Sequence, residues 1–221
     1  MISDAAGNRA DILERVLESG AVAVVRMPDS DQLVRVVEAV LEGGVTAIEI
    51  TMTTPNALKV IEDVARRMGD VVEIGVGSVL DAATAHRAVD AGARYVVSPV
   101  LKKEVVDAAH QRGVPAMPGA FSPTEIQRAS EMGADLIKVF PADIVGMPFF
   151  KAVLAPLPHL KLMPTGGVSL TNAGDWIRSG AVAVGVGSAL LDRRAIDEGD
   201  YAKLTENARQ LRRSVEDGRA A

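Results

Sequence analysis

The segment Leu136-Ile137-Lys138-Val139-Phe140-Pro141-Ala142 places β-branched and large apolar residues around a single charge and closes with a proline. This pattern predicts a short buried strand. Because side chains alternate along a strand, Leu136, Lys138 and Phe140 share one face, and the ammonium group lies among apolar neighbours. An unpaired buried charge costs several kcal/mol. The sequence therefore predicts either a partner for Lys138 or a site that uses its side chain as an amine.

Glycines divide the rest of the chain into similar units. Each one follows a helix-like stretch and precedes an apolar stretch, as a left-handed helix C-cap would. These glycines are Gly20, Gly44, Gly69, Gly92, Gly113, Gly133 and Gly180. The expected strands cover residues 21–26, 47–51, 72–75, 94–98, 114–117, 136–140, 161–164 and 181–185. Amphipathic helices are expected between them, and residues 10–19 form an extra helix before the first strand.

Eight strand–helix units predict a single (β/α)8 TIM barrel over residues 1–221. An open, doubly wound parallel sheet is the alternative, although no Gly-x-Gly-x-x-Gly fingerprint follows the first strand. Three helix starts have their own signals. Ser122-Pro123-Thr124-Glu125 has the sequence of a capping box, and Thr54 and Asp81 are predicted N-caps.

The composition argues against several classes of function. A net charge of −5 and the lack of a basic run with aromatic residues predict no nucleic-acid partner. The chain has no cysteine, which suits a cytoplasmic protein and leaves no disulfide or thiol nucleophile. Residues 1–7 lack the pattern of a signal peptide, and no apolar run is long enough to cross a membrane. The three histidines do not assemble with carboxylates, so neither a metal nor another cofactor is expected.

Reacting groups in such barrels lie at the C-terminal ends of the strands. Glu49, in Ala47-Ile48-Glu49-Ile50-Thr51, is a second lone charge in an apolar strand. It lies on the face opposite Ile48 and Ile50, so it points into the barrel. Side chains from alternate strands share a layer inside these barrels, which allows Glu49 and Lys138 to meet across the lumen. The alternative interpretation of this pair is a buried structural salt bridge.

A lysine must be neutral when it attacks a carbonyl. Freeing a lysine amine at pH 7, from an ordinary pKa of about 10.4, costs roughly 4.6 kcal/mol. Burial and the nearby cation Arg26 both favour the neutral amine. Glu49 acts in the opposite direction, so we expect Thr51 or a water molecule to occupy its carboxylate.

Two glycine-containing turns predict a phosphate site. Pro164-Thr165-Gly166-Gly167-Val168 follows the seventh expected strand, and Gly185-Val186-Gly187-Ser188 ends the eighth. Phosphate sites in these barrels form from the same two loops, where glycines let an anion approach backbone N–H groups. The alternative is that both segments are simply tight turns.

These segments, taken in order, resemble a known family. The strings are Glu49-Ile50-Thr51, Gly75-Val76-Gly77-Ser78-Val79-Leu80, Ser98-Pro99, Met117-Pro118-Gly119, Lys138-Val139-Phe140-Pro141-Ala142, Pro164-Thr165-Gly166-Gly167 and Val186-Gly187-Ser188. They are similar to the 2-keto-3-deoxy-6-phosphogluconate (KDPG) and 4-hydroxy-2-oxoglutarate (KHG) aldolase family. The resemblance implies a (β/α)8 barrel, a homotrimer and class I Schiff-base chemistry without metal.

The resemblance also implies roles for individual residues. Lys138 matches the Schiff-base lysine and Glu49 the general acid/base. The implied substrate-binding residues are Arg26, Thr51, Thr53, Ser78, Pro99 and Phe140, and the implied phosphate-binding residues are Thr165, Gly166, Gly167, Gly187 and Ser188. One position departs from the family. Many members have an arginine where this chain has Thr53, whereas some relatives have one at the end of the first strand, which matches Arg26.

The sequence therefore predicts a cytoplasmic aldehyde-lyase of carbohydrate metabolism, in the Entner-Doudoroff type of sugar-acid breakdown. It would cleave KDPG to pyruvate and glyceraldehyde 3-phosphate, with KHG as a further substrate. One alternative is an aldolase for the epimeric 2-keto-3-deoxy-6-phosphogalactonate. A second is a sugar-phosphate epimerase or isomerase that uses Glu49 as a base. A third is a sugar-phosphate sensor without catalysis.

Overall fold

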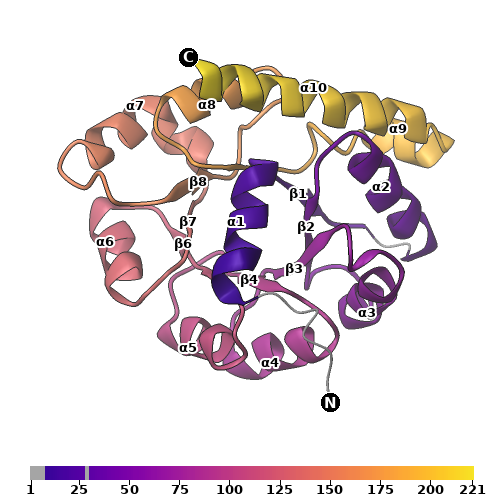
Figure 1. The fold of residues 1–221 in the computed structure, drawn as a ribbon, viewed down its shortest axis with the longest axis horizontal. Coiled ribbons are helices and arrows are strands. Elements are labelled where there is room, and N and C mark those ends of the chain that lie inside the picture. The colour runs from indigo at the N-terminus through magenta and orange to yellow at the C-terminus, as the bar shows by residue number, and fades with distance from the viewer. Residues whose placement is uncertain (1–7, 28–29) are drawn as a thin grey trace.

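The computed structural model describes residues 8–27 and 30–221 (Figure 1). The prediction about a signal peptide concerns residues 1–7, which lie outside this range. Parallel strands form the centre of the molecule and helices lie around them, while α1 crosses one end of the strands. The fold is thus α/β with a curved parallel sheet. Within the described ranges, no helix is both long enough and apolar enough to span a membrane.

The strands are short, and all their pairings are parallel. One sheet has the order β5-β4-β3-β2-β1-β9 and the other the order β6-β7-β8. Their bounds are β1 (Ala21–Val25), β2 (Ala47–Thr51), β3 (Glu73–Gly77), β4 (Tyr95–Val97), β5 (Ala116–Met117), β6 (Gly119–Ala120), β7 (Ile137–Val139), β8 (Leu162–Pro164) and β9 (Val184–Val186). Backbone hydrogen bonds also connect the two sheets: Asp135 N donates to Ala116 O over 3.0 Å, and Val182 N donates to Leu162 O over 3.0 Å.

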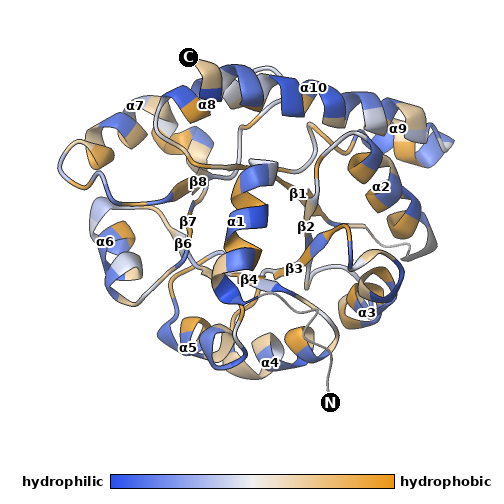
Figure 2. Ribbon diagram, viewed as in Figure 1, coloured by the Kyte–Doolittle hydropathy of each residue, from blue (hydrophilic) through white to orange (hydrophobic). Residues whose placement is uncertain are grey.

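The helices turn their apolar sides toward the strands (Figure 2). Their bounds are α1 (Arg9–Ser19), α2 (Ser30–Glu42), α3 (Ala57–Met68), α4 (Ala82–Asp90), α5 (Lys103–Gln111), α6 (Pro123–Glu131), α7 (Ala142–Leu154), α8 (Ala173–Arg178), α9 (Arg193–Glu198) and α10 (Tyr201–Ala220). The predicted helix before the first strand is confirmed as α1. The glycine C-caps are left-handed at every predicted position except Gly69, which has a φ of −61°. Its N–H donates to Ala65 O and so extends the helical hydrogen bonding.

Most of the predicted strands differ from those observed by one or two residues at their ends, and two differ further. The fifth, predicted over residues 114–117, is observed only as the short β5, and a separate strand, β6, follows Pro118, because proline has no N–H to donate to a ladder. The eighth begins at Val184 rather than at Ala181, because Ala181 N still donates to Trp176 O in the turn that closes α8. The N-cap prediction at Thr54 is also wrong. Thr54 N donates to Thr51 O in a turn, and α3 starts only after Asn56.

The predicted capping box at the start of α6 is confirmed. The Ser122 hydroxyl accepts a hydrogen bond from Glu125 N over 3.3 Å, and the Glu125 carboxylate accepts one from Ser122 N over 2.8 Å. Asp81 likewise accepts a hydrogen bond from Thr84 N at the start of α4. Local sequence therefore sets where these two helices begin.

We expect Ser122→Ala to lower the free energy of unfolding by about 1 kcal/mol, because it removes one half of the capping box. Glu125→Ala should destabilise the protein near pH 7 but much less in acid. The backbone N–H groups of Ser122 and Phe121 hold the pKa of the Glu125 carboxyl below its usual range. Its contribution is therefore complete above the ordinary glutamate pKa and is lost as the pH falls through the lowered value. Urea unfolding of both variants at pH 7 and at pH 3 measures this, and an equal loss from Glu125→Ala at both would contradict it.

Each face of the strands is covered by its own layer of apolar side chains. Ile48, Ile50, Ile137 and Val139 pack in the layer between strands and helices. The other layer lies inside the curve of the sheet and comprises Leu13, Val16, Val22, Ala47, Tyr95, Val97, Met117, Leu136, Met163 and Ala183. Positions 49 and 138 alternate with the first set, so the predicted inward orientation of Glu49 and Lys138 is confirmed.

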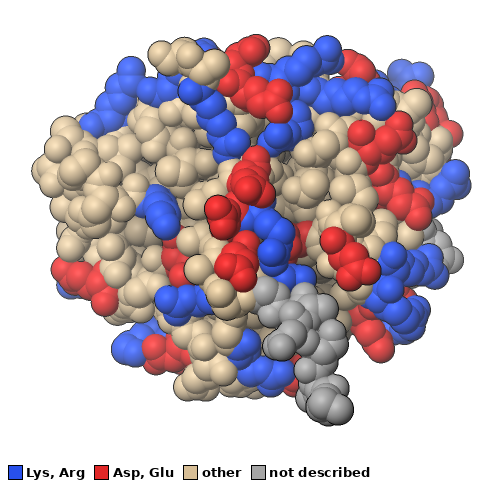
Figure 3. All heavy atoms as spheres, viewed as in Figure 1, with Lys and Arg blue, Asp and Glu red and all other residues tan. Residues whose placement is uncertain are grey.

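Helix α1 closes the N-terminal end of the strands. Arg212 and Arg219 of α10 each donate to the Glu18 carbonyl, over 3.0 and 3.1 Å, near the C-terminus of α1. Arg15 of α1 forms an ion pair with Glu73 at the start of β3. Acidic and basic side chains lie over α1 and along α10 on this face, with broad uncharged areas on either side (Figure 3). A reactive site between the strands therefore opens at the opposite end, where the strands terminate.

Candidate active site

Lys138 and Glu49 meet inside the curve of the sheet. The Lys138 Nζ atom lies 3.5 Å from Glu49 Oε1, and the two residues are 6% and 1% exposed. They come from β7 and β2, which are in different sheets. Lys138 Nζ also lies 5.6 Å from the centre of the Phe140 ring. The predicted contact between the two lone charges is therefore present.

The Glu49 carboxylate occupies space that β3 leaves open. A Cβ atom at Gly77 would lie 1.9 Å from Glu49 Oε1, closer than any real contact. Thr51 was expected to occupy this carboxylate, but its hydroxyl instead lies 2.8 Å from the Thr53 hydroxyl. In the part of the chain that the structure describes, neither carboxylate oxygen of Glu49 has a hydrogen-bond partner.

This geometry suits an amine nucleophile better than a structural ion pair. A charge-assisted hydrogen bond is usually about 2.7–2.9 Å long, so the 3.5 Å contact leaves both charges poorly compensated. An amine and a carboxyl group side by side are the two groups that a carbonyl needs for attack at carbon and for proton transfer at oxygen.

The other predicted substrate-binding residues follow the C-terminal ends of the strands. Ser78 has a left-handed backbone with a φ of 60° directly after β3, and Pro99 follows β4 half-buried. Phe140 directly follows β7 and is 39% exposed, while Thr53 is exposed after β2. These positions place them on the same end of the strands as Lys138 and Glu49.

The first predicted phosphate turn has the expected backbone. Gly166 and Gly167 have φ values of 97° and 71°, so both adopt a conformation that favours glycine. Thr165 is buried next to Gly185, with which it forms a parallel bridge. The side chain of Asn172 donates to the Gly167 carbonyl over 3.0 Å and so fixes the turn from outside.

The second phosphate turn lines a cavity of about 610 Å³. Gly187, Ser188 and Arg26 all contribute to its wall, together with apolar side chains such as Met27 and Leu191. Arg26 and Ser188 are exposed. The structure thus brings Arg26 next to one of the two predicted phosphate turns.

Sequence reasoning missed two residues beside the pair. Gly77 provides the space for Glu49, and Tyr95 is completely buried in the inner layer. The sequence does contain a pattern that could have identified Gly77. In Glu73-Ile74-Gly75-Val76-Gly77, both inward-facing positions after Glu73 are glycines. Within the described ranges, no group of three or more His, Asp and Glu side chains has the arrangement of a metal site.

Comparisons with known proteins point in one direction. The sequence model of a family described as KDPG and KHG aldolase matches residues 12–207. A 2-dehydro-3-deoxy-phosphogluconate aldolase from Treponema pallidum is 34% identical over 201 residues, which cover 90% of this chain and 94% of that protein. A probable 2-dehydro-3-deoxy-6-phosphogalactonate aldolase from Rhizobium meliloti is 36% identical over 175 residues, which cover 79% and 82%.

A solved structure agrees with these sequence relatives. It is the KDPG aldolase of Legionella pneumophila, with pyruvate captured at low pH as a covalent carbinolamine intermediate. The TM-score is 0.84 at 29% identity, and the match covers 90% of this chain and 97% of that chain.

Proposed function

Because this chain belongs to the KDPG and KHG aldolase family and is an aldolase, we propose that it cleaves 2-keto-3-deoxy-6-phosphogluconate to pyruvate and glyceraldehyde 3-phosphate. The reaction follows the class I, Schiff-base route. One observation supports this most directly: a lysine amine and a carboxylate lie 3.5 Å apart in a buried site, on strands that the sequence separates by about ninety residues.

In the proposed mechanism, the neutral amine of Lys138 attacks the C2 carbonyl of the substrate. Glu49 protonates the oxygen, which leaves as water, and a protonated imine remains on Lys138. Glu49, now a carboxylate, takes the proton of the C4 hydroxyl while the bond between C3 and C4 breaks. The bonding electrons move into the imine and form an enamine. Glyceraldehyde 3-phosphate departs, C3 of the enamine receives the proton, and water releases pyruvate from Lys138.

The proposed substrate has two anionic groups, a carboxylate and a phosphate, and we assign each to a different set of residues. We assign the carboxylate to the guanidinium of Arg26, with Ser78, Pro99 and Phe140 around the pyruvate portion and Thr51 and Thr53 beside it. We assign the phosphate to the backbone N–H groups of the turns at Thr165, Gly166 and Gly167 and at Gly187 and Ser188. The left-handed glycines and the position of Ser188 in the large cavity support this second assignment.

The proposal extends to the architecture. The two sheets are linked by the hydrogen bonds described above and by the bridge between Thr165 and Gly185, which supports a closed (β/α)8 barrel with β5 and β6 as one strand. Several large apolar side chains outside the proposed substrate site are exposed within a few residues of strand ends: Leu80, Val100, Phe121 and Ile144. Exposed apolar side chains of this size support the proposed homotrimer. We also propose a cytoplasmic location, which is supported by a charged, phosphorylated substrate that does not cross a membrane unaided.

Trapping with pyruvate and borohydride tests the class of mechanism. Borohydride reduces an imine to a stable secondary amine, so peptide mass mapping identifies the lysine that carried pyruvate. We expect the adduct on the peptide containing Lys138. An adduct on another lysine contradicts the assignment of Lys138, and no adduct at all favours an epimerase, an isomerase or a non-catalytic sensor.

The epimeric 2-keto-3-deoxy-6-phosphogalactonate is the second candidate substrate, because the Rhizobium meliloti relative is named for it. Initial cleavage rates on the two phosphorylated epimers, measured side by side with the unphosphorylated KHG, decide between them. We expect the highest kcat/KM for the gluconate epimer.

Arg26→Gln is expected to raise the KM for pyruvate in the trapping reaction by about 10- to 100-fold, because a carboxylate loses a charged hydrogen-bond donor. Pyruvate has a carboxylate but no phosphate, so it reports on one anion only. A variant that keeps the KM for pyruvate but raises it for the phosphorylated substrate would instead place Arg26 at the phosphate. Arg193→Gln, in the same cavity wall, is the matched control.

A further inference from the structure

The inward face of β3 lacks side chains at two successive positions. A Cβ atom at Gly75 would lie 2.1 Å from Cε2 and 2.3 Å from Cζ of the Tyr95 ring. At Gly77 it would collide with Glu49, as described above. Gly75 pairs with Glu49 on one side and with Tyr95 on the other. The Tyr95 phenol of β4 and the Glu49 carboxylate of β2 therefore lie over β3, in the column of space that Gly75 and Gly77 leave open.

The Tyr95 hydroxyl is a buried donor without a partner. Tyr95 is 0% exposed, and among the described residues its hydroxyl makes no hydrogen bond. Burial, followed by the negative charges of Glu49 and Glu73, raises the pKa of this hydroxyl well above its usual range. It therefore stays protonated at any pH at which the enzyme works. An unsatisfied buried polar group is costly, which makes the arrangement informative.

Of the two carboxylates near the Tyr95 hydroxyl, Glu49 is the one that still needs a hydrogen-bond donor. Glu73, at the lower end of the column, is already in ion pairs with Arg15 of α1 and Arg94 of the segment before β4. Glu49, at the upper end, has Lys138 as its ion-pair partner among the described residues, at 3.5 Å, and both its oxygens lack hydrogen bonds there. A donor and an acceptor that are buried in the same column and do not touch are commonly bridged by one ordered water.

We propose that Tyr95 is a positioning residue for the catalytic carboxylate: its hydroxyl donates to a buried water, which in turn donates to Glu49. This inference rests on the proposed role of Glu49 as general acid/base. The bridge holds the carboxylate against Gly77 and stabilises its ionised form, which is the form that takes the C4 proton. It does not touch the substrate or the amine of Lys138, so the amount of imine formed at saturating pyruvate does not depend on it, although the rate of imine formation does.

Tyr95→Phe tests the proposal with the loss of one oxygen atom. We expect kcat for cleavage to fall about tenfold, the change expected when a water-mediated hydrogen bond to a charged carboxylate is lost. The acidic limb of the kcat–pH profile should move to higher pH, and exchange of the pyruvate methyl protons with deuterated water should slow in proportion. The amount of pyruvate trapped on Lys138 at saturation and the thermal midpoint should stay close to those of the wild type.

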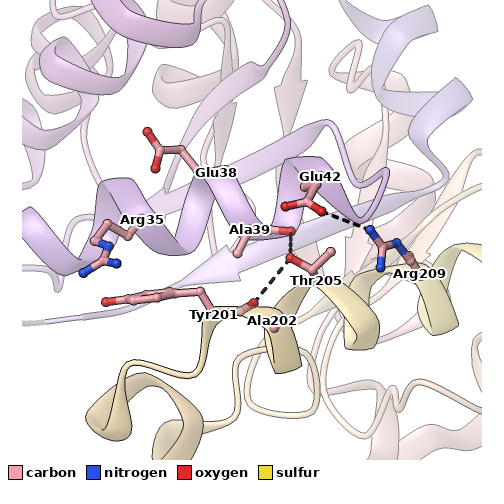
Figure 4. A pocket seen from close by; sticks show the side chains of 8 residues that line it. All are labelled: Arg35, Glu38, Ala39, Glu42, Tyr201, Ala202, Thr205 and Arg209. Carbon is pink, nitrogen blue, oxygen red and sulfur yellow. Dashed lines mark hydrogen bonds and ion pairs between the residues drawn. The ribbon is translucent and has the colours of Figure 1, made fainter.

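Tyr201→Phe is the matched control, since the chain has only two tyrosines. Tyr201 is the first residue of α10 and lines a surface pocket between α2 and α10 (Figure 4). The Cζ atom of Arg35 lies 4.4 Å from the centre of the Tyr201 ring. This control should leave kcat and its pH profile unchanged.

Three outcomes separate the inference from the function on which it rests. An unchanged kcat and pH profile in Tyr95→Phe overturns the inference and leaves the aldolase mechanism intact. A loss of trapping as large as the loss of kcat also overturns it, because Tyr95 would then support the fold of the whole site. If the wild type is not trapped at Lys138, or if Glu49→Gln keeps full activity, the proposed function itself fails.

Discussion

Lys138→Met is expected to lower kcat/KM for the cleavage of KDPG by about 10⁴-fold or more and to abolish the borohydride adduct with pyruvate. Methionine has nearly the length and volume of lysine, so it fills the same space between β6 and β8. What it removes is the nitrogen that forms the covalent bond. No other described lysine lies in the buried interior, so no side chain can take over this role. Coupled assay of pyruvate release and intact mass after borohydride treatment measure both effects.

A folding control is needed, because the substitution also removes one partner of a buried pair. Loss of one partner commonly destabilises by about 3–5 kcal/mol when the other stays charged. We therefore expect a lowered thermal midpoint in a protein that still folds at the assay temperature. Lys161→Met, at an exposed lysine just before β8, should be folded and fully active. A Lys138→Met protein that is folded and still forms the adduct would show that another amine is the nucleophile.

The position of this pair was predictable from local rules. Alternation in residues 47–51 and 136–140 is enough to turn Glu49 and Lys138 to the same side as Ala47 and Leu136. Both segments are strands that run in parallel, so both charges approach the same end. The capping box at Ser122 and the left-handed glycines such as Gly20 were predictable for the same reason, because each depends on a few neighbouring residues.

The features that could not be predicted depend on contacts between distant segments. Pro118 separates β5 from β6 in a segment that is otherwise apolar. Its carbonyl still accepts a hydrogen bond from Lys138 N, which only the three-dimensional structure shows. Tyr95 fills space beside Gly75, which lies one strand away, and no spacing rule connects a tyrosine to a glycine in this manner. The ion pairs of Glu73 with Arg15 and Arg94 likewise need the full three-dimensional arrangement.

Gly77→Ala is expected to lower kcat by about 10²- to 10³-fold, the range associated with loss of a general acid/base. The added methyl group would stand 1.9 Å from Glu49 Oε1 and 2.6 Å from its Cδ, so the carboxylate has to leave its position. Gly77 does not have a positive φ, so alanine strains no backbone angle there. Lys138 is not displaced, so pyruvate trapping should still reach completion at saturating pyruvate, although more slowly, because Glu49 also protonates the leaving oxygen. Steady-state kinetics and trapping on the same sample separate the two steps.

Gly43→Ala provides the matched control, because its methyl group would also collide, at 2.3 Å from the Ala208 Cβ atom, but between α2 and α10. It should lower the thermal midpoint and leave kcat of the folded protein unchanged.

The double variant that combines Gly77→Ala with Glu49→Gln gives the sharper test. If Gly77→Ala acts through the carboxylate, adding it to Glu49→Gln lowers kcat little further, because the group that it displaces has already lost its function. Independent, multiplicative losses would mean that Gly77 serves the fold of β3 rather than the position of Glu49.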